Sequence, residues 1–115
     1  MASTNWKTLY AATLATTTGA VAILTVPANQ SNVITKFTVS NITGSAALGT
    51  IAITPSGGTL RQVWSKVVPA APTLGGVIEV VELEGTILSP GDVVTFTAGT
   101  ANALVPMISG VAYTA

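Results

Sequence analysis

The side chains best suited to acid–base or metal chemistry in this chain are its four acids, Glu79, Glu82, Glu84 and Asp92, since the 115 residues include no His and no Cys. General acid–base catalysis and nucleophile activation draw mainly on His, Cys or paired carboxylates. If residues 77–83 form a strand, Glu82 and Glu84 share one face and Glu79 lies on the other. Two such carboxylates supply too few oxygen ligands for a cation site. The sequence therefore predicts no catalytic residue, no metal site and no cofactor, and hence no enzyme.

Asp92 closes the segment Ser89-Pro90-Gly91-Asp92, which has the composition of a tight turn. Pro presets the backbone angle of the second turn position, and Gly accepts the positive angle of the third. An Asp beside such a turn commonly accepts hydrogen bonds from nearby backbone amides. We therefore expect Asp92 to have a structural role.

Charge is scarce and balanced in this chain. Only 7% of the residues are charged against 49% that are hydrophobic, the formal net charge is zero and the mean hydropathy is +0.66. Four dispersed cations make no basic face, which argues against nucleic-acid binding. No apolar run reaches the roughly 18 residues of a membrane-spanning helix, and the N-terminus does not resemble a secretory signal. The absence of Cys slightly favours a reducing compartment.

Short stretches rich in Val, Ile and Thr, separated by Gly, Pro, Asn or Ser, predict strands throughout. The expected strands cover residues 8–14, 21–26, 32–42, 47–54, 60–68, 77–83, 92–98 and 104–113. The segment Pro69–Gly76 is rich in Pro and Gly and is expected to be a surface loop. About eight short strands without helical crossovers predict an all-β fold, a single antiparallel β-sandwich or jelly roll, with a simple barrel as the rival.

Residues 32–42 show the clearest alternation of polarity. Val33, Thr35, Phe37 and Val39 are expected on one face, with Lys36, Thr38 and Ser40 on the other. Ahead of the first expected strand, residues 1–7 are small and polar apart from Trp6 and Lys7. They are expected to form a flexible N-terminal arm, and residues 8–115 a single sandwich domain.

Five segments of this chain form a recognisable series. They are Thr8-Leu9-Tyr10, Leu24-Thr25-Val26-Pro27-Ala28, the strand Val33–Asn41, an apolar strand ending near Pro55-Ser56-Gly57-Gly58, and Leu88-Ser89-Pro90-Gly91-Asp92. Together these segments resemble small virion proteins of tailed bacteriophages. The resemblance extends over about Leu9 to Val111, although the loop Pro69–Gly76 is not part of the family pattern. The resemblance implies a β-sandwich that associates with itself and docks on a shell or tail, with no catalytic residues.

The residues also favour self-association on physical grounds. Val77–Val81 and Val21–Leu24 are apolar on both strand faces, whereas a sandwich has one core to fill. Large apolar patches on soluble proteins mark interfaces. The candidate interface residues are the aromatic and charged side chains Trp6, Tyr10, Arg61, Trp64, Lys66 and Glu82. Trp is frequent at binding hot spots, and Arg61, Lys66 and Lys36 are expected to pair with the glutamates across subunits.

The sequence thus predicts a virion structural protein, made in the host cytoplasm and located in the virion. We expect a capsid decoration or cement protein that forms a homo-oligomer, a trimer in the first instance, and binds the major capsid protein. The alternatives are a tail, neck or fibre component of the same virion, and a β-sandwich module that binds a glycan. Neither a nucleic acid nor a membrane is an expected partner.

Overall fold

The computed structural model describes residues 3–70 and 76–114, and in these ranges the chain forms nine strands and a short 3-10 turn, η2. The elements in chain order are β1 (Ser3–Tyr10), β2 (Val21–Thr25), β3 (Gln30–Asn41), β4 (Ala47–Thr54), β5 (Arg61–Val68), β6 (Val77–Glu79), η2 (Val81–Leu83), β7 (Ile87–Leu88), β8 (Val93–Ala98) and β9 (Leu104–Thr114).

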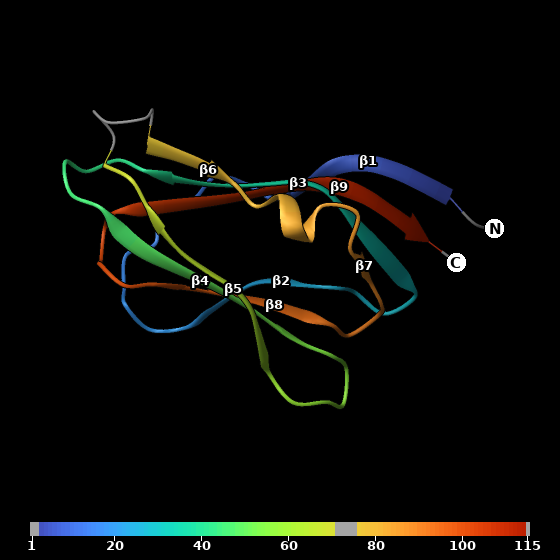
Figure 1. The fold of residues 1–115 in the computed structure, drawn as a ribbon. Helices are drawn as coiled ribbons and strands as arrows, with labels where there is room; N and C mark the ends of the chain where they lie inside the picture. Colours follow the sequence, from blue (N-terminus) through green and yellow to red (C-terminus); the bar gives the residue numbers. More distant parts are fainter. Residues whose placement is uncertain (1–2, 71–75, 115) are drawn as a thin grey trace.

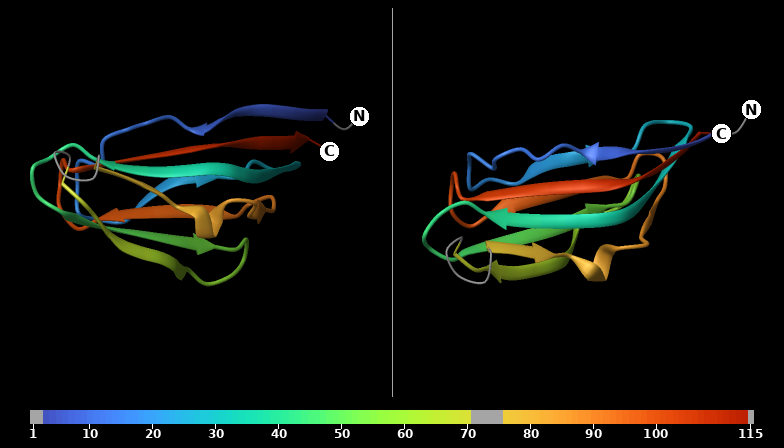
Figure 2. Two further views of the ribbon diagram at one scale, coloured as in Figure 1. Left: turned by 45° about the horizontal axis from the view of Figure 1, so that its top comes forward. Right: turned by 90° about the horizontal axis from the view of Figure 1, so that it is seen from above.

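The strands form two antiparallel sheets that pack face to face (Figures 1 and 2). Sheet A has the order β1-β9-β3-β6, with the short β7 also paired to β3, and sheet B has the order β2-β8-β4-β5. The all-β sandwich predicted from the sequence is therefore confirmed. Strands β1 and β5 lie at sheet edges, and the N-terminal end of β1 lies beside the C-terminal end of β9.

The core lies between the sheets and is built from the inward side chains of both. Phe37 of β3 lies opposite Ile108 of β9 in sheet A, and Ile51 of β4 lies opposite Phe96 of β8 in sheet B; all four are buried. A Cβ atom at position 49 would lie 3.3 Å from the Trp64 ring. Gly49 thus makes room for a large indole, and Trp64 is only 4% exposed.

A β-bulge in β3 changes the expected alternation of this strand. The register with β9 shifts between Ile34 and Lys36, so that Thr35 is the extra residue. An inserted residue inverts the phase of a strand, because side chains alternate with a period of two. Ile34 is therefore buried on the same side as Phe37, whereas Val33 was expected there. The predicted unbroken alternation is wrong before the bulge and correct after it.

The first strand begins five residues earlier than expected, at Ser3 instead of Thr8. Residues 3–7, which the sequence suggests as an arm, pair with residues 110–114 of β9. This pairing satisfies backbone groups along one side of β9 that would otherwise need other partners. Met1 and Ala2 lie outside the described residues, as does most of the expected loop Pro69–Gly76.

The expected strand 77–83 is also shorter than predicted. β6 ends at Glu79, the amide of Val80 still donates to the Phe37 carbonyl at 2.8 Å, and η2 then turns the chain. The amide of Glu84 donates to the Val81 carbonyl at 3.2 Å, and the amide of Gly85 returns to the Ile34 carbonyl of β3 at 2.6 Å. Because η2 interrupts the strand, Glu79, Glu82 and Glu84 do not follow the alternation of faces expected for one continuous strand.

The turn predicted at Ser89–Asp92 is confirmed in detail. The Asp92 amide donates to the Ser89 carbonyl at 3.0 Å, and Gly91 has a φ angle of +86°, which favours glycine. The Asp92 carboxylate accepts hydrogen bonds from the amides of Ser89 and Ser56, each at 2.9 Å. The structural role expected for Asp92 is therefore confirmed.

Candidate interaction sites

One edge of the sandwich is closed by an ion pair between the two sheets. Lys66 of β5 donates to Glu82 of η2 over 2.6 Å, and both side chains are about half exposed. This hydrogen bond is the main reason why the pKa of Glu82 is lowered. The nearby indole Nε1 of Trp64 has no hydrogen-bond partner within the described part of the chain. Lys66 and Glu82, expected to pair with other subunits, here pair with each other.

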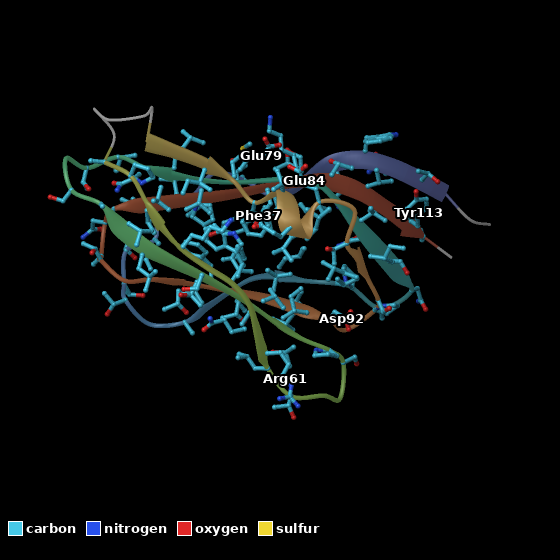
Figure 3. All side chains as sticks on the ribbon, in the orientation of Figure 1. Phe37, Arg61, Glu79, Glu84, Asp92 and Tyr113 are labelled. Atoms are coloured by element: carbon cyan, nitrogen blue, oxygen red, sulfur yellow. The ribbon has the colours of Figure 1, made fainter. Side chains whose placement is uncertain are left out.

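The other two glutamates lie close together, Glu79 at the end of β6 and Glu84 directly after η2 (Figure 3). A hydrogen bond with Glu79 is the largest cause of the raised pKa of Glu84, followed by loss of hydration and by repulsion from the Glu79 charge; Lys36 partly opposes the shift. The expectation that Glu82 and Glu84 share a face is wrong because η2 interrupts the strand. In residues 3–70 and 76–114, no three His, Cys, Asp or Glu side chains are close enough to hold a metal.

The predicted aromatic and basic interface candidates lie in different surroundings. Trp6 is 73% exposed on β1, whereas Trp64 is buried in the core and Tyr10 packs partly against it. Arg61 is exposed at the start of β5 and points away from the sandwich (Figure 3). The structure thus does not bring these residues into one site, and Trp6 and Arg61 are the candidates most open to solvent.

The outer face of sheet B carries an apolar surface that we call the β4–β5 patch, made of Leu48 and Val67. Leu48 and Val67 are direct partners in the β4–β5 register, and they are 45% and 58% exposed. Beside them the hydroxyls of Thr50 and Ser65 are 3.2 Å apart. β5 is thus apolar on both faces, as predicted, because Trp64 and Val68 on its other face are buried.

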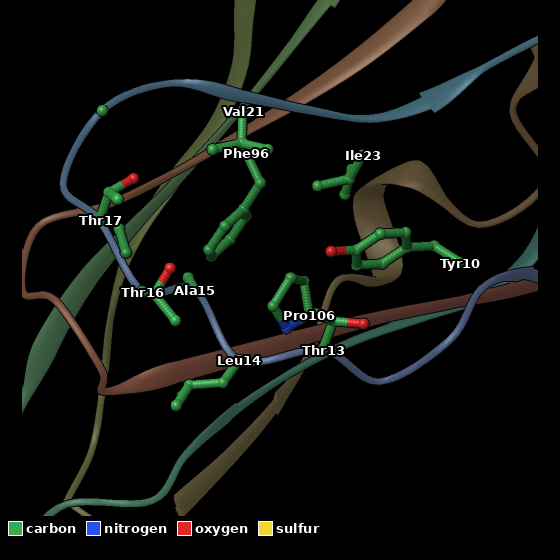
Figure 4. A pocket seen from close by; sticks show the side chains of 12 residues that line it. Tyr10, Thr13, Leu14, Ala15, Thr16, Thr17, Val21, Ile23, Phe96 and Pro106 are labelled. Atoms are coloured by element: carbon green, nitrogen blue, oxygen red, sulfur yellow. The ribbon is translucent and has the colours of Figure 1, made fainter.

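A pocket opens between the sheets on the side of β1 and β2. Its cavity is about 210 Å³, and the rings of Tyr10, Phe96 and Pro106 point into it (Figure 4). The loop that covers it is fixed at Ala15, whose amide donates to the Leu104 carbonyl at 2.8 Å and whose carbonyl accepts from the Asn102 amide at 2.9 Å. The pocket is therefore a cavity at the sandwich edge whose walls combine apolar rings with the threonine side chains of the covering loop.

A larger and more open depression, the end groove, lies where two turns meet the end of sheet A. It has a volume of about 640 Å³ and is lined by Ala28, Asn29, Gln30, Ser31, Pro90, Tyr113 and Thr114. Tyr113 is 45% exposed. The sequence patterns predict the turn at Pro90 but not this groove, because segments around positions 30, 90 and 113 meet only through the pairing of β3 with β9 and the packing of the turns.

The fold and these surfaces define a β-sandwich whose exposed features are apolar strand faces, aromatic rings, uncharged polar groups and a few dispersed charged side chains. No protein-family model matches the chain, and no curated protein matches it. Within the described residues, no helix has the length and apolar character needed to cross a membrane.

Two solved structures of phage capsid proteins show similarity to the chain. Each is described as a pentameric capsid protein isolated from metagenomic phage sequences. The first is 20% identical with a TM-score of 0.42, and the match covers 94% of this chain and 61% of the other protein. The second is 17% identical with a TM-score of 0.40, covering 94% of this chain and 68% of the other. The chain therefore spans less than two thirds of the length of the first.

Proposed function

We propose that this protein is a structural component of a tailed-phage virion, a decoration or cement protein that associates with itself and docks on the head shell. A trimer is the oligomer expected first. The proposal is supported by the sequence resemblance, whose segments include Val33–Asn41 of β3 and the turn at Leu88–Asp92. Binding only to the assembled shell would stabilise that state over its dissociated parts by mass action.

The observation that carries self-association is the β4–β5 patch beside a free strand edge. Among the residues that the structure describes, β5 is the last strand of sheet B, so one side of its backbone has no strand partner there. An exposed edge of this kind can pair with another chain, and apolar side chains next to it add buried area on association. Lys66, the cation on this strand nearest to the patch, is neutralised by Glu82. Little charge therefore opposes contact between copies.

The oligomeric state tests this part of the proposal. We expect light scattering after size exclusion to give a multiple of the chain mass at low micromolar concentration. Val67→Lys places a charge in the patch and should weaken association by about tenfold or more, since burying an unpaired charge is costly. Ile87→Lys is the matched control, because Ile87 is exposed on β7 in the other sheet. A wild-type protein that stays monomeric would contradict the proposal.

The virion role is tested by counting copies in particles. Hundreds of copies on the head, located by electron cryomicroscopy, would support decoration, and purified protein should then bind saturably to expanded heads that lack it. A few copies, or a few dozen at the portal vertex, would instead make the protein a neck or tail part. Absence from purified particles would refute a virion role altogether.

A further inference from the structure

The end groove is bordered by an aromatic residue, two amide residues and two hydroxyl residues, and none of its lining residues in the described part of the chain is charged. Tyr113 and Ser31 are direct partners with the outward strand phase, Gln30 and Thr114 are direct partners with the opposite phase, and Asn29 lies in the turn before β3. All seven lining residues are uncharged. Amides offer both donors and acceptors in one plane, and hydroxyls offer both at one atom. The groove is thus suited to a ligand that has many hydroxyls and no charge.

The turns that form the groove are tied to each other by backbone hydrogen bonds. The amide of Val26 donates to the Asp92 carbonyl at 2.9 Å, and the amide of Gly91 donates back to the Val26 carbonyl at 2.9 Å. The amide of Gln30 closes the other turn on the Pro27 carbonyl at 3.2 Å. The Asp92 carboxylate further holds the turn that contains Pro90. The groove therefore exists before a ligand binds, which lowers the entropic cost of binding.

We propose that the end groove binds a neutral saccharide. The Tyr113 ring offers an apolar face against which the C–H face of a sugar ring packs, while the Ser31 hydroxyl on the same sheet face and the Asn29 amide of the adjoining turn bond its hydroxyls. Because the lining residues that the structure describes include no cation, they offer no charged partner for a carboxylate or phosphate, and this favours uncharged sugars. This binding activity goes beyond the structural role proposed above and does not depend on it.

A second aromatic side chain extends the site along sheet A. Trp6 of β1 lies opposite Val111, two residues before Tyr113, so Trp6 and Tyr113 are diagonal neighbours with the same strand phase. Diagonal neighbours in an antiparallel pair are about 7–8 Å apart, within reach of aromatic side chains. Trp6 is highly exposed. A saccharide of more than one unit can therefore contact both rings, and Trp6 should matter more for longer ligands.

The binding test is a titration of isotope-labelled protein, followed by NMR, with neutral trisaccharides of glucose, galactose, mannose or N-acetylglucosamine. Trigalacturonate serves as the charged comparison. We expect at least one neutral probe to give saturable shifts centred on residues 28–31, 90 and 113–114, with a millimolar dissociation constant or tighter. Trigalacturonate should bind more weakly. Failure of every neutral probe to bind in this groove, or tighter binding of trigalacturonate, would overturn the proposal.

Variants then assign the roles within the groove. Tyr113→Ala should weaken binding about tenfold or more, equivalent to about 1.4 kcal/mol, whereas Tyr113→Phe keeps the ring and most of the affinity. Asn29→Gly removes the amide but suits the φ angle of +66° at this position, so the turn is retained. Val67→Ala, on the other sheet, should leave binding unchanged. Equal binding by wild-type and a folded Tyr113→Ala protein would refute the assignment.

Discussion

Asn41 is buried at the end of β3, and its side chain makes four hydrogen bonds. Its Nδ2 donates to the carbonyls of Ser45 and Val68 at 2.8 and 3.2 Å, and its Oδ1 accepts from the amide and the hydroxyl of Thr43 at 2.9 and 2.8 Å. These bonds join the β3–β4 turn to the end of β5. Asn32, in the same strand, is equally buried, but its Oδ1 has no partner among the described residues.

Replacement of each Asn by Leu, which has a similar volume, should therefore have different effects. In Asn41→Leu the Val68 carbonyl and the Thr43 amide each lose a partner, while the Thr43 hydroxyl keeps its bond to the Ser45 carbonyl at 3.0 Å. A buried polar group left without its partner costs about 1–3 kcal/mol, and the Thr43 amide is only partly buried, so the two groups together should cost about 2–4 kcal/mol. Asn32→Leu removes an unpaired oxygen and should change the free energy of unfolding by less than about 1 kcal/mol.

The assay is urea unfolding followed by tryptophan fluorescence, because Trp64 lies in the core and reports its exposure. An unchanged dependence of the free energy on urea would show that the surface exposed on unfolding is the same in both variants. Both substitutions are made in the Val67→Lys protein, which should associate weakly, and are measured at one protein concentration. Oligomer dissociation then does not contribute to the difference between them. Equal destabilisation by the two substitutions would refute the reasoning. It would mean that the change in side-chain shape, and not the loss of hydrogen bonds, lowers the free energy of unfolding.

Two further predictions concern pH and glycine positions. Because the pKa of Glu84 is raised beside Glu79, the folded state binds a proton more tightly than the unfolded state, and stability falls as pH rises from about 4.5 through the raised value. The difference in melting temperature, Glu84→Gln minus wild type, should therefore increase as the pH is raised from 4 to 7. A difference that does not change with pH would contradict this. Gly110→Ala should be strongly destabilising, since its Cβ would overlap the Val33 carbonyl. Gly19→Ala, which has open space around it, should instead raise the free energy of unfolding by about 0.4–1 kcal/mol, as measured by thermal unfolding. Similar effects of the two substitutions on stability would be inconsistent with this geometry.

Much of the fold was accessible from local sequence patterns. The strands expected at 47–54 and 104–113 agree with β4 and β9 to within one residue, and the turn at Ser89–Asp92 has the predicted hydrogen bonds. These features depend on the two-residue period of side chains in a strand and on the backbone preferences of Pro and Gly. Both are local properties that a few consecutive residues determine. The bulge at Thr35 and the turn η2 interrupt that period without a comparable local signal.

The candidate sites were less accessible, because they join segments that are distant in the sequence. Trp64 is an interface candidate in the sequence because Trp is frequent at binding hot spots, but the missing side chain at Gly49 on the neighbouring strand allows it into the core. Lys66 and Glu82 meet across the sandwich edge, and Tyr113 meets the turns at Asn29 and Pro90 at its end. Pairing between strands, which composition does not encode, decides each of these contacts.

The sequence by itself determined the all-β class, the position of most strands, and a surface poor in charge, since these follow from residue types and short-range periodicity. The tertiary structure alone decided which side chains meet. One inserted residue in β3 reverses the face of every residue before it, and the register of β9 against its neighbours brings Trp6, Tyr113 and the end groove to the same end of sheet A. Side-chain phase and long-range register are set by packing of the whole sandwich, and hence only the folded chain reveals its sites.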